Sequence, residues 1–133
     1  MILRKTLIGA MVGIGLVACT PTNKAPSFDA VLDTHFAAIT ARDLDAYLAT
    51  ITNGETLPLI FPDGEMMSTR QEVADFLKMW FAMPDWRMES ELVSKVVGSD
   101  LATAIFKTGY RDTLDGEARY SYLALTFQLQ DGE

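Results

Sequence analysis

The spacing of apolar residues changes at Pro84-Asp85, and this change most limits the folds open to the chain. Before it, apolar residues recur every three or four positions, as in an amphipathic helix. From Trp86 onward they alternate with polar residues, as in a half-buried strand. Helical segments followed by a run of strands predict an α+β domain, with the helices on one face of an antiparallel sheet.

Three helices are predicted ahead of this change. Ser27 and Asp43 are suitable N-caps for the first two, and Asn53-Gly54 should end the second. The third opens at two overlapping capping boxes, in which Ser68 and Thr69 each precede a Gln or Glu by three residues. Its apolar face consists of Val73, Phe76, Leu77 and Trp80.

Five strands are predicted after the second helix. Residues 56–61 and 65–67 form a short hairpin, and three longer strands follow the third helix. The longer strands cover residues 87–97, 101–112 and 118–129. The last is followed by Asp131-Gly132, a hairpin turn signal, so a final strand is missing from the sequence or a partner supplies this edge.

The N-terminus has the layout of a secretory signal. Arg4 and Lys5 precede an apolar and glycine stretch, residues 7–17, that is too short to span a bilayer. The ending Leu16-Val17-Ala18-Cys19 resembles the bacterial lipobox, although an ordinary secreted protein is the simpler alternative. The resemblance implies that residues 1–18 are a signal peptide and that Cys19 becomes an acylated N-terminus.

Acylation would anchor the protein in a bacterial cell envelope. Two or three palmitate-type chains on Cys19 hold a protein far more firmly than one. Residues 19–27 would then be the lipidated cysteine and a tether of at most ~26 Å to the domain at 28–133. Since residue 20 is Thr and not Asp, the sorting rule of enteric lipoproteins favours the periplasmic face of the outer membrane, if the source has one.

Composition argues against a nucleic-acid partner, a disulfide and a metal site. Removing residues 1–18 would remove two positive charges and take the formal net charge from −7 to −9, which is unsuited to nucleic acid. Cys19 is the only cysteine, so no disulfide is expected within the chain. A single histidine, His35, with no nearby motif acid is a poor metal site, and we expect no metal and no cofactor.

The order of the predicted elements resembles the nuclear transport factor 2-like superfamily, which includes SnoaL-like cyclases and ketosteroid isomerase. The likeness rests on residues 36–45 (FAAITARDLD), on Asp63-Gly64 and on residues 70–76, and it covers residues 28–133. It implies a cone of three N-terminal helices on a strongly curved, mostly antiparallel sheet. It also implies an interior pocket and a homodimer through the outer sheet face.

The resemblance also suggests which residues to test for catalysis. His35 falls where ketosteroid isomerase has its oxyanion-binding tyrosine. Leu59 and Leu125 fall at that enzyme's two acid positions, and leucine can neither move a proton nor donate to an enolate. We therefore do not expect isomerase chemistry, and the final strand that carries the acid of SnoaL-like cyclases is absent from this sequence.

His35 remains the one candidate catalytic residue, as a hydrogen-bond donor or a base. The simpler interpretation is a half-buried histidine at a helix edge. Phe76 and Trp80 could line a pocket or be plain core residues. The candidate ligand-binding residues are His35, Leu59, Phe76, Trp80 and Leu125.

Strand alternation predicts an apolar outer sheet face. If Leu125 points inward, so do Leu123 and Phe127. The outward residues are then Tyr120, Tyr122, Ala124 and Thr126, with Ala102, Ala104, Phe106 and Tyr110 on the neighbouring strand. Because so apolar a face should be covered, we expect a homodimer through it and not a monomer. The same parity points Lys107 inward, where it would snorkel to a rim, pair with an acid or indicate a register error of one residue.

Three functions are compatible with these residues. The first is a membrane-anchored, non-catalytic pocket domain that binds a small apolar or amphipathic ligand or supports an envelope partner. The second is an isomerase-, cyclase- or dehydratase-type enzyme that uses His35 on a small hydrophobic substrate. The third is an interaction module whose pocket has collapsed.

Overall fold

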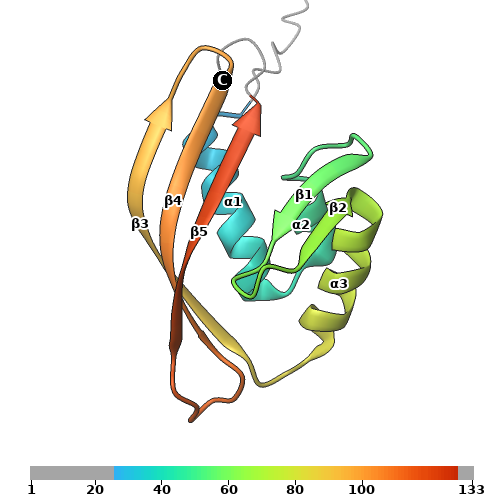
Figure 1. The fold of residues 1–133 in the computed structure, drawn as a ribbon, viewed down its shortest axis with the longest axis vertical. Coiled ribbons are helices and arrows are strands. Elements are labelled where there is room, and N and C mark those ends of the chain that lie inside the picture. The colour runs from blue at the N-terminus through green and yellow to red at the C-terminus, as the bar shows by residue number, and fades with distance from the viewer. Residues whose placement is uncertain (1–25, 129–133) are drawn as a thin grey trace, which may run out of the picture.

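The computed structural model describes residues 26–128. The predicted signal peptide, Cys19, most of the tether and the turn at Asp131-Gly132 lie outside the described residues. The elements in chain order are α1 (Phe28–Ala41), α2 (Leu44–Leu48), β1 (Thr56–Ile60), β2 (Met66–Thr69), α3 (Arg70–Ala82), β3 (Arg87–Val97), β4 (Leu101–Arg111) and β5 (Arg119–Gln128) (Figure 1). The predicted α+β class is confirmed.

The caps of the first two helices follow the sequence prediction at their N-termini. The Ser27 side chain accepts a hydrogen bond from the backbone of Ala30, and Asp43 accepts one from Ala46. At its C-terminus α1 ends on Arg42, which has a left-handed backbone with φ 56°. Helix α2 ends at Leu48, well before the predicted stop at Asn53-Gly54.

Only one of the two predicted capping boxes forms at α3. The Thr69 hydroxyl accepts a hydrogen bond from the Glu72 backbone, and the Glu72 carboxylate accepts from the backbone N–H groups of Ser68 and Thr69. Three hydrogen bonds to the Glu72 carboxylate lower its pKa, the bond from Ser68 contributing most. The Gln71 side chain donates to Asp75 instead of returning to Ser68.

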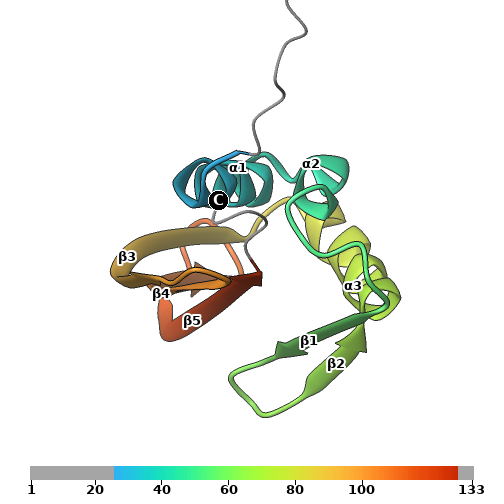
Figure 2. The same ribbon diagram turned by 90° about the horizontal axis from the view of Figure 1, so that it is seen from above.

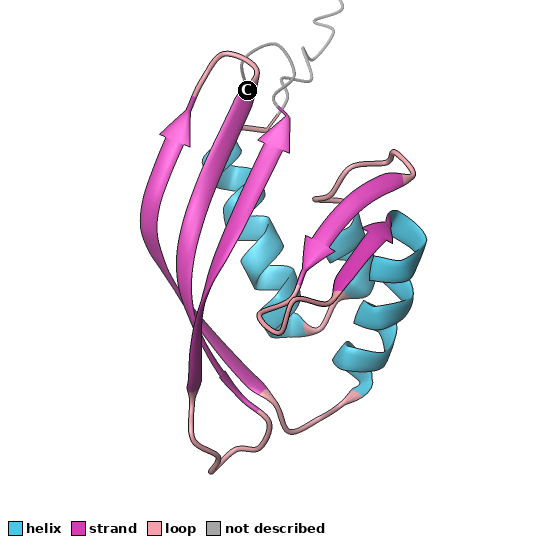
Figure 3. Ribbon diagram, viewed as in Figure 1, coloured by secondary structure: helices cyan, strands magenta, loops and turns pink. Residues whose placement is uncertain are grey.

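The strands form two antiparallel sheets, a β1–β2 hairpin and a β3-β4-β5 meander (Figure 3). Seen from above, α1 lies over one face of the meander, whereas α3 lies beside the hairpin (Figure 2). A register shift between Leu92 and Ser94 makes Val93 a bulge in β3. Within residues 26–128, β5 pairs with β4 alone.

Two apolar clusters form the core. The first packs α1 against the meander and contains Phe28, Leu32, Ala102, Ala104 and Phe106. The second joins the end of α1 to α3 and the start of β3, and contains Ile39, Val73, Leu77, Phe81 and Trp86. The half-buried Phe36 packs against both clusters, so the core is continuous through α1.

The prediction for the faces of β4 is wrong by one residue. Ala104 pairs with Leu125 and Phe106 with Leu123, and directly paired residues share a face. Ala102, Ala104 and Phe106 therefore face α1 and are buried, and Tyr110 packs in the second cluster. Small alanines suit this position because they let the helix approach the sheet closely.

Lys107 consequently points outward, where its ammonium lies 5.0 Å from the centre of the Tyr120 ring. Of the three explanations for its predicted inward position, the register error is correct. The predicted parity of β5 is confirmed, with Leu123, Leu125 and Phe127 packed inward. Tyr120 and Tyr122 are 67% and 72% exposed on the outer face.

Candidate functional site

His35 lies in the interior of the molecule, between the two apolar clusters. The prediction of a half-buried histidine is wrong, because its side chain is only 2% exposed. Its ring centre lies 4.3 Å from that of Tyr47, 5.7 Å from that of Phe36 and 6.3 Å from that of Phe127. The imidazole thus has aromatic neighbours from α1, α2 and β5.

The hydrogen bonds around His35 fix its tautomer. The Nδ1 atom lies 2.7 Å from Oγ1 of Thr50, and the Thr50 hydroxyl donates to the Tyr47 carbonyl at 2.7 Å. That bond uses the single hydroxyl proton, so Thr50 must accept from Nδ1–H. A neutral imidazole protonated at Nδ1 has a free lone pair at Nε2. None of the hydrogen bonds among residues 26–128 involves this Nε2.

Burial keeps this group of side chains neutral. It lowers the pKa of His35 to about 4 and raises the pKa of the Tyr47 phenol to about 12. Within the described part of the chain, the Tyr47 hydroxyl also makes no hydrogen bond. His35 therefore offers a hydrogen-bond acceptor at Nε2, and the adjacent ring of Tyr47, a half-buried residue, offers a donor in its hydroxyl.

The other predicted ligand-binding residues are divided between the two clusters. Leu125 packs in the first, and Leu59, Phe76 and Trp80 pack in the second. His35 contacts both, through Phe127 on one side and Tyr47 on the other. Whether all five contact one ligand stays a prediction.

Sequence reasoning missed Thr50 as a partner of His35. A signal was present, because Tyr47 belongs to the apolar stripe of α2 and Thr50 follows it by three residues. No local pattern, however, shows that the residue after α2 meets the middle of α1.

Arg42 and Trp86 form a second polar feature that the sequence did not reveal. The Arg42 guanidinium lies 4.6 Å from the centre of the Trp86 ring and donates to the carbonyls of Pro84 and Trp86, at 2.8 and 2.9 Å. The Trp86 ring stacks on Trp80 with centres 4.3 Å apart. This arrangement makes Trp86 a core residue, 4% exposed, and assigns Arg42 a structural role.

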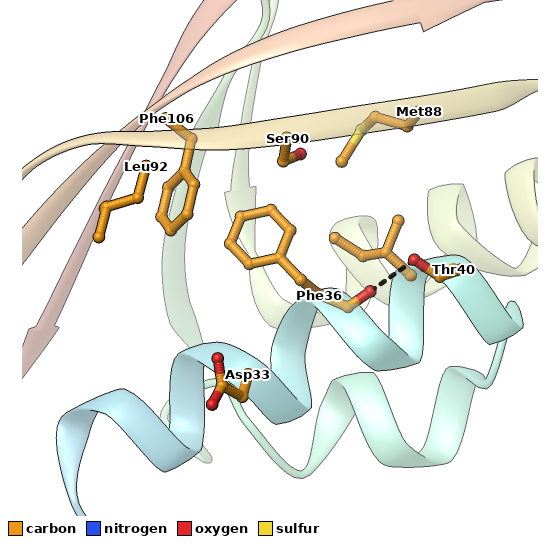
Figure 4. A pocket seen from close by; sticks show the side chains of 8 residues that line it. Asp33, Phe36, Thr40, Met88, Ser90, Leu92 and Phe106 are labelled. Atoms are coloured by element: carbon orange, nitrogen blue, oxygen red, sulfur yellow. Dashed lines mark hydrogen bonds between the residues drawn. The ribbon is translucent and has the colours of Figure 1, made fainter.

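A separate cavity of about 320 Å³ opens between α1 and β3 (Figure 4). It is lined by Asp33, Phe36, Ile39, Thr40, Met88, Ser90, Leu92 and Phe106. None of the five predicted ligand-binding residues is among them. The cavity and the surroundings of His35 are therefore two different places on α1.

Residues 26–128 contain no group of three or more His, Cys, Asp or Glu side chains arranged to hold a metal ion. No helix in the described part of the chain is long and apolar enough to cross a membrane.

No protein-family model matches the chain, and neither does any curated protein sequence. Solved structures do share its fold. A Thiobacillus denitrificans protein, named for the calcium/calmodulin-dependent protein kinase type II association domain, matches with a TM-score of 0.69 at 22% identity. This match covers 80% of the present chain and 87% of the other.

Two further structures extend this likeness. A nuclear transport factor 2-like protein of unknown function from Shewanella oneidensis has a TM-score of 0.62 at 17% identity, over 77% of this chain and 84% of its own. An LEH-like epoxide hydrolase from M. tuberculosis has a TM-score of 0.57 at 12% identity, over 77% and 72%. The chain thus has the cone-shaped α+β fold of nuclear transport factor 2-like domains, with a sheet that is not closed. Such different neighbours show that this fold does not fix function.

Proposed function

We propose that this domain is a non-catalytic binding domain that holds a small neutral ligand with an apolar body and one hydroxyl-type group next to His35. The observation that carries the proposal is the buried, neutral imidazole, whose Nδ1–H is engaged by Thr50 while Nε2 lacks a partner within residues 26–128. Among the described residues, Nε of Arg42 is the one fully buried side-chain nitrogen or oxygen without a partner, so Nε2 of His35 is not fully enclosed. A ligand that donates to Nε2 would add one hydrogen bond, with a net contribution of about 1 kcal/mol.

The chemistry of the neighbouring side chains supports a hydroxyl. A hydroxyl can donate to Nε2 of His35 and accept from the Tyr47 phenol at the same time. The rings of Tyr47, Phe36 and Phe127 offer an apolar surface to the body of the ligand. An ionised ligand would have to leave water without a charged partner among these rings, which is strongly unfavourable.

An enzyme that uses His35 as a base is the second candidate, and the unprotonated Nε2 is the observation in its favour. A base whose conjugate acid has a pKa of about 4 is weak at neutral pH, however. No carboxylate contacts His35 within the described residues, and Leu59 and Leu125 cannot transfer protons. Binding without turnover is therefore the better supported function.

The proposal can be tested with pairs of alcohols and methyl ethers of the same skeleton. We would titrate the protein with 1-octanol and cyclohexanol, and with 1-methoxyoctane and methoxycyclohexane. The ¹⁵N resonances of His35 in long-range ¹H–¹⁵N spectra serve as the readout. The alcohols should move the Nε2 resonance and bind about fivefold more tightly than the ethers, since one hydrogen bond contributes about 1 kcal/mol. Equal affinity for alcohols and ethers would contradict the proposal.

A His35→Phe variant supplies the matched control. It keeps an aromatic ring but removes Nε2, so the preference for alcohols should disappear while the ethers still bind. A His35→Ala variant tests the enzyme alternative. Turnover of a candidate substrate by the wild-type protein, lost in His35→Ala, would favour catalysis over simple binding.

We also propose that the domain is tethered to a bilayer through acylated Cys19 in a bacterial cell envelope. The lipobox-like sequence before Cys19 supports this. Mass spectrometry of the protein extracted from envelopes should find acyl chains on Cys19. A Cys19→Ser variant should move to the soluble fraction, and an unmodified wild-type protein would count against the anchor.

A homodimer through the outer sheet face is a further part of the proposal. This face exposes large apolar side chains from all three long strands, namely Val96, Leu101, Ile105, Tyr120 and Tyr122. Burying them against a second copy would remove a patch that monomers rarely expose. Light scattering on a non-lipidated form should give twice the chain mass, and Tyr122→Glu should return the monomer mass. A monomeric wild-type protein at micromolar concentration would refute the dimer.

A further inference from the structure

We infer that the groove between α1 and β3 is a second ligand site, which takes a small amphipathic cation such as a primary alkylammonium ion. Its ammonium group would lie on Asp33, and its alkyl chain would lie over the apolar floor of the groove. This site is distinct from the interior around His35, and the inference does not depend on the proposed function.

The groove exists because α1 covers β4 but leaves the inner side of β3 open. On β4, Ala102 and Ala104 are 1% and 0% exposed beneath the helix. Leu92 of β3 pairs with the buried Phe106 and shares its inward face, yet it is 47% exposed. The bulge at Val93 follows Leu92 and bends the edge strand at this point. The result is the cavity of about 320 Å³, at the lower end of the range for small-molecule sites.

The floor of the groove is apolar. Phe36 projects into its middle and packs on Phe106, with ring centres 4.3 Å apart (Figure 4). Met88, Leu92 and Ile39 complete the apolar lining. An alkyl chain that covers these side chains would gain roughly 25 cal/mol for each Å² of apolar surface removed from water.

The polar lining is suited to a cation and not to an anion. Asp33 lies on α1 toward the Leu92 end of the groove, and Thr40 lies on the same helix toward the Met88 end (Figure 4). Asp29, one helical turn before Asp33, is paired with Lys95. No hydrogen bond or ion pair within residues 26–128 occupies the Asp33 carboxylate, which is therefore available to a ligand.

The two hydroxyl groups of the groove also have acceptor capacity. The Thr40 hydroxyl donates its proton to the Phe36 carbonyl at 3.0 Å, so its oxygen can only accept a hydrogen bond from a ligand. The Ser90 hydroxyl has no hydrogen bond among the described residues and can accept as well. An ammonium group supplies three donors and no acceptor, and so matches the Asp33 carboxylate, which only accepts.

The test compares three ligands with the same eight-carbon chain: n-octylammonium, 1-octanol and octanoate. With ¹³C-methyl-labelled methionine, the Met88 signal reports binding in the groove. Octylammonium should shift this signal and bind at least about threefold more tightly than octanol, while octanoate should be the weakest. An ion pair near the surface contributes up to about 1 kcal/mol, which corresponds to a factor of about five.

Two matched variants test the role of the carboxylate. Asp33→Asn should weaken octylammonium about threefold to fivefold and leave octanol unchanged. Asp115→Asn removes the same charge in the turn before β5 and should change neither affinity. Leu92→Arg places a guanidinium in the groove and should abolish the Met88 shift. The variant should stay folded, because the Leu92 side chain is already 47% exposed.

The outcomes separate this site from the one at His35. His35→Phe should leave octylammonium binding unchanged, whatever it does to alcohols elsewhere. Equal binding of the three ligands, or equal effects of Asp33→Asn and Asp115→Asn, would overturn the cation site. Loss of the Met88 shift in His35→Phe would also overturn it, because the ligand would then occupy the interior.

Discussion

Nδ1 of His35 lies 2.7 Å from Oγ1 of Thr50, and this contact joins the middle of α1 to the chain just after α2. Because the Thr50 proton is committed to the Tyr47 carbonyl, the imidazole must present its lone pair, and not a proton, at Nε2. Such a group can receive a hydrogen bond from a ligand. It cannot donate a hydrogen bond to an oxyanion at neutral pH, because Nε2 carries no proton.

The buried His35 should make the stability of the domain depend on pH. Its pKa falls from the ordinary 6.5 to about 4 on folding, so the unfolded state binds the extra proton between these values. Stability is therefore fully present above pH 6.5 and is lost as the pH falls toward 4, by up to about 3 kcal/mol. Urea unfolding at pH 7.0 and pH 4.5 measures this difference.

A His35→Phe variant isolates the contribution of the imidazole. The variant should lose less stability between the two pH values than the wild-type protein. The pH dependence that remains in the variant comes from the carboxylates. Identical pH profiles for the two proteins would mean that His35 titrates normally in the folded state.

Arg42 should contribute more to the free energy of unfolding than any exposed cation of the domain. Arg42→Met removes two hydrogen bonds to the carbonyls of Pro84 and Trp86 and the contact with the Trp86 ring. We expect a loss of about 2–3 kcal/mol in the free energy of unfolding, with a change in tryptophan fluorescence. Arg111→Met is the control, since its ion pair with Glu89 spans 3.8 Å and is exposed. A control that costs as much as Arg42→Met would refute the assigned role.

The capping box of α3 can be tested by two neighbouring substitutions. Thr69→Ala removes the hydroxyl that caps the helix and should cost about 1 kcal/mol. Ser68→Ala should cost much less, because only the backbone N–H of Ser68 is bound by Glu72. Thermal unfolding of both variants decides between the two boxes suggested by the sequence. A larger effect at Ser68 would contradict the observed cap.

The corrected register of β4 predicts opposite effects for two alanines on neighbouring strands. Ala104 is fully buried under α1, so Ala104→Leu should force the helix away and cost about 1–3 kcal/mol or more. Ala124 faces outward opposite Ile105, so Ala124→Leu should change stability by less than about 0.5 kcal/mol. Chemical denaturation of the two variants would reveal a reversed register as a reversed order of stabilities.

Much of the fold could be predicted because its signals are local. The helix caps at Ser27, Asp43 and Thr69 and the alternation along β3 to β5 are set by neighbours in sequence. The faces of β4 could not be assigned in this way, since they depend on which residue pairs with Leu125 across the turn before β5. Lys107 already pointed to the error, because a lysine on an inner face has no ready partner.

The sites were less accessible to sequence reasoning. His35 could be selected as the only histidine in a plausible pocket position, but its tautomer depends on Thr50, fifteen residues away. The groove depends on the bulge at Val93 and on the side of the sheet that α1 leaves open. Both are tertiary features, and no periodicity in the chain encodes them.

The contacts of Arg42 also join two parts of the chain that are distant in sequence. Its hydrogen bonds to Pro84 and Trp86 close a loop of 42–44 residues that contains α2, the hairpin and α3. Closing so long a loop carries an entropic cost that only later contacts repay. The backbone of Arg42 closes α1 locally, through bonds to the carbonyls of Ala38 and Ile39. Its guanidinium adds a long-range link, which holds the end of the first helix to the start of the meander.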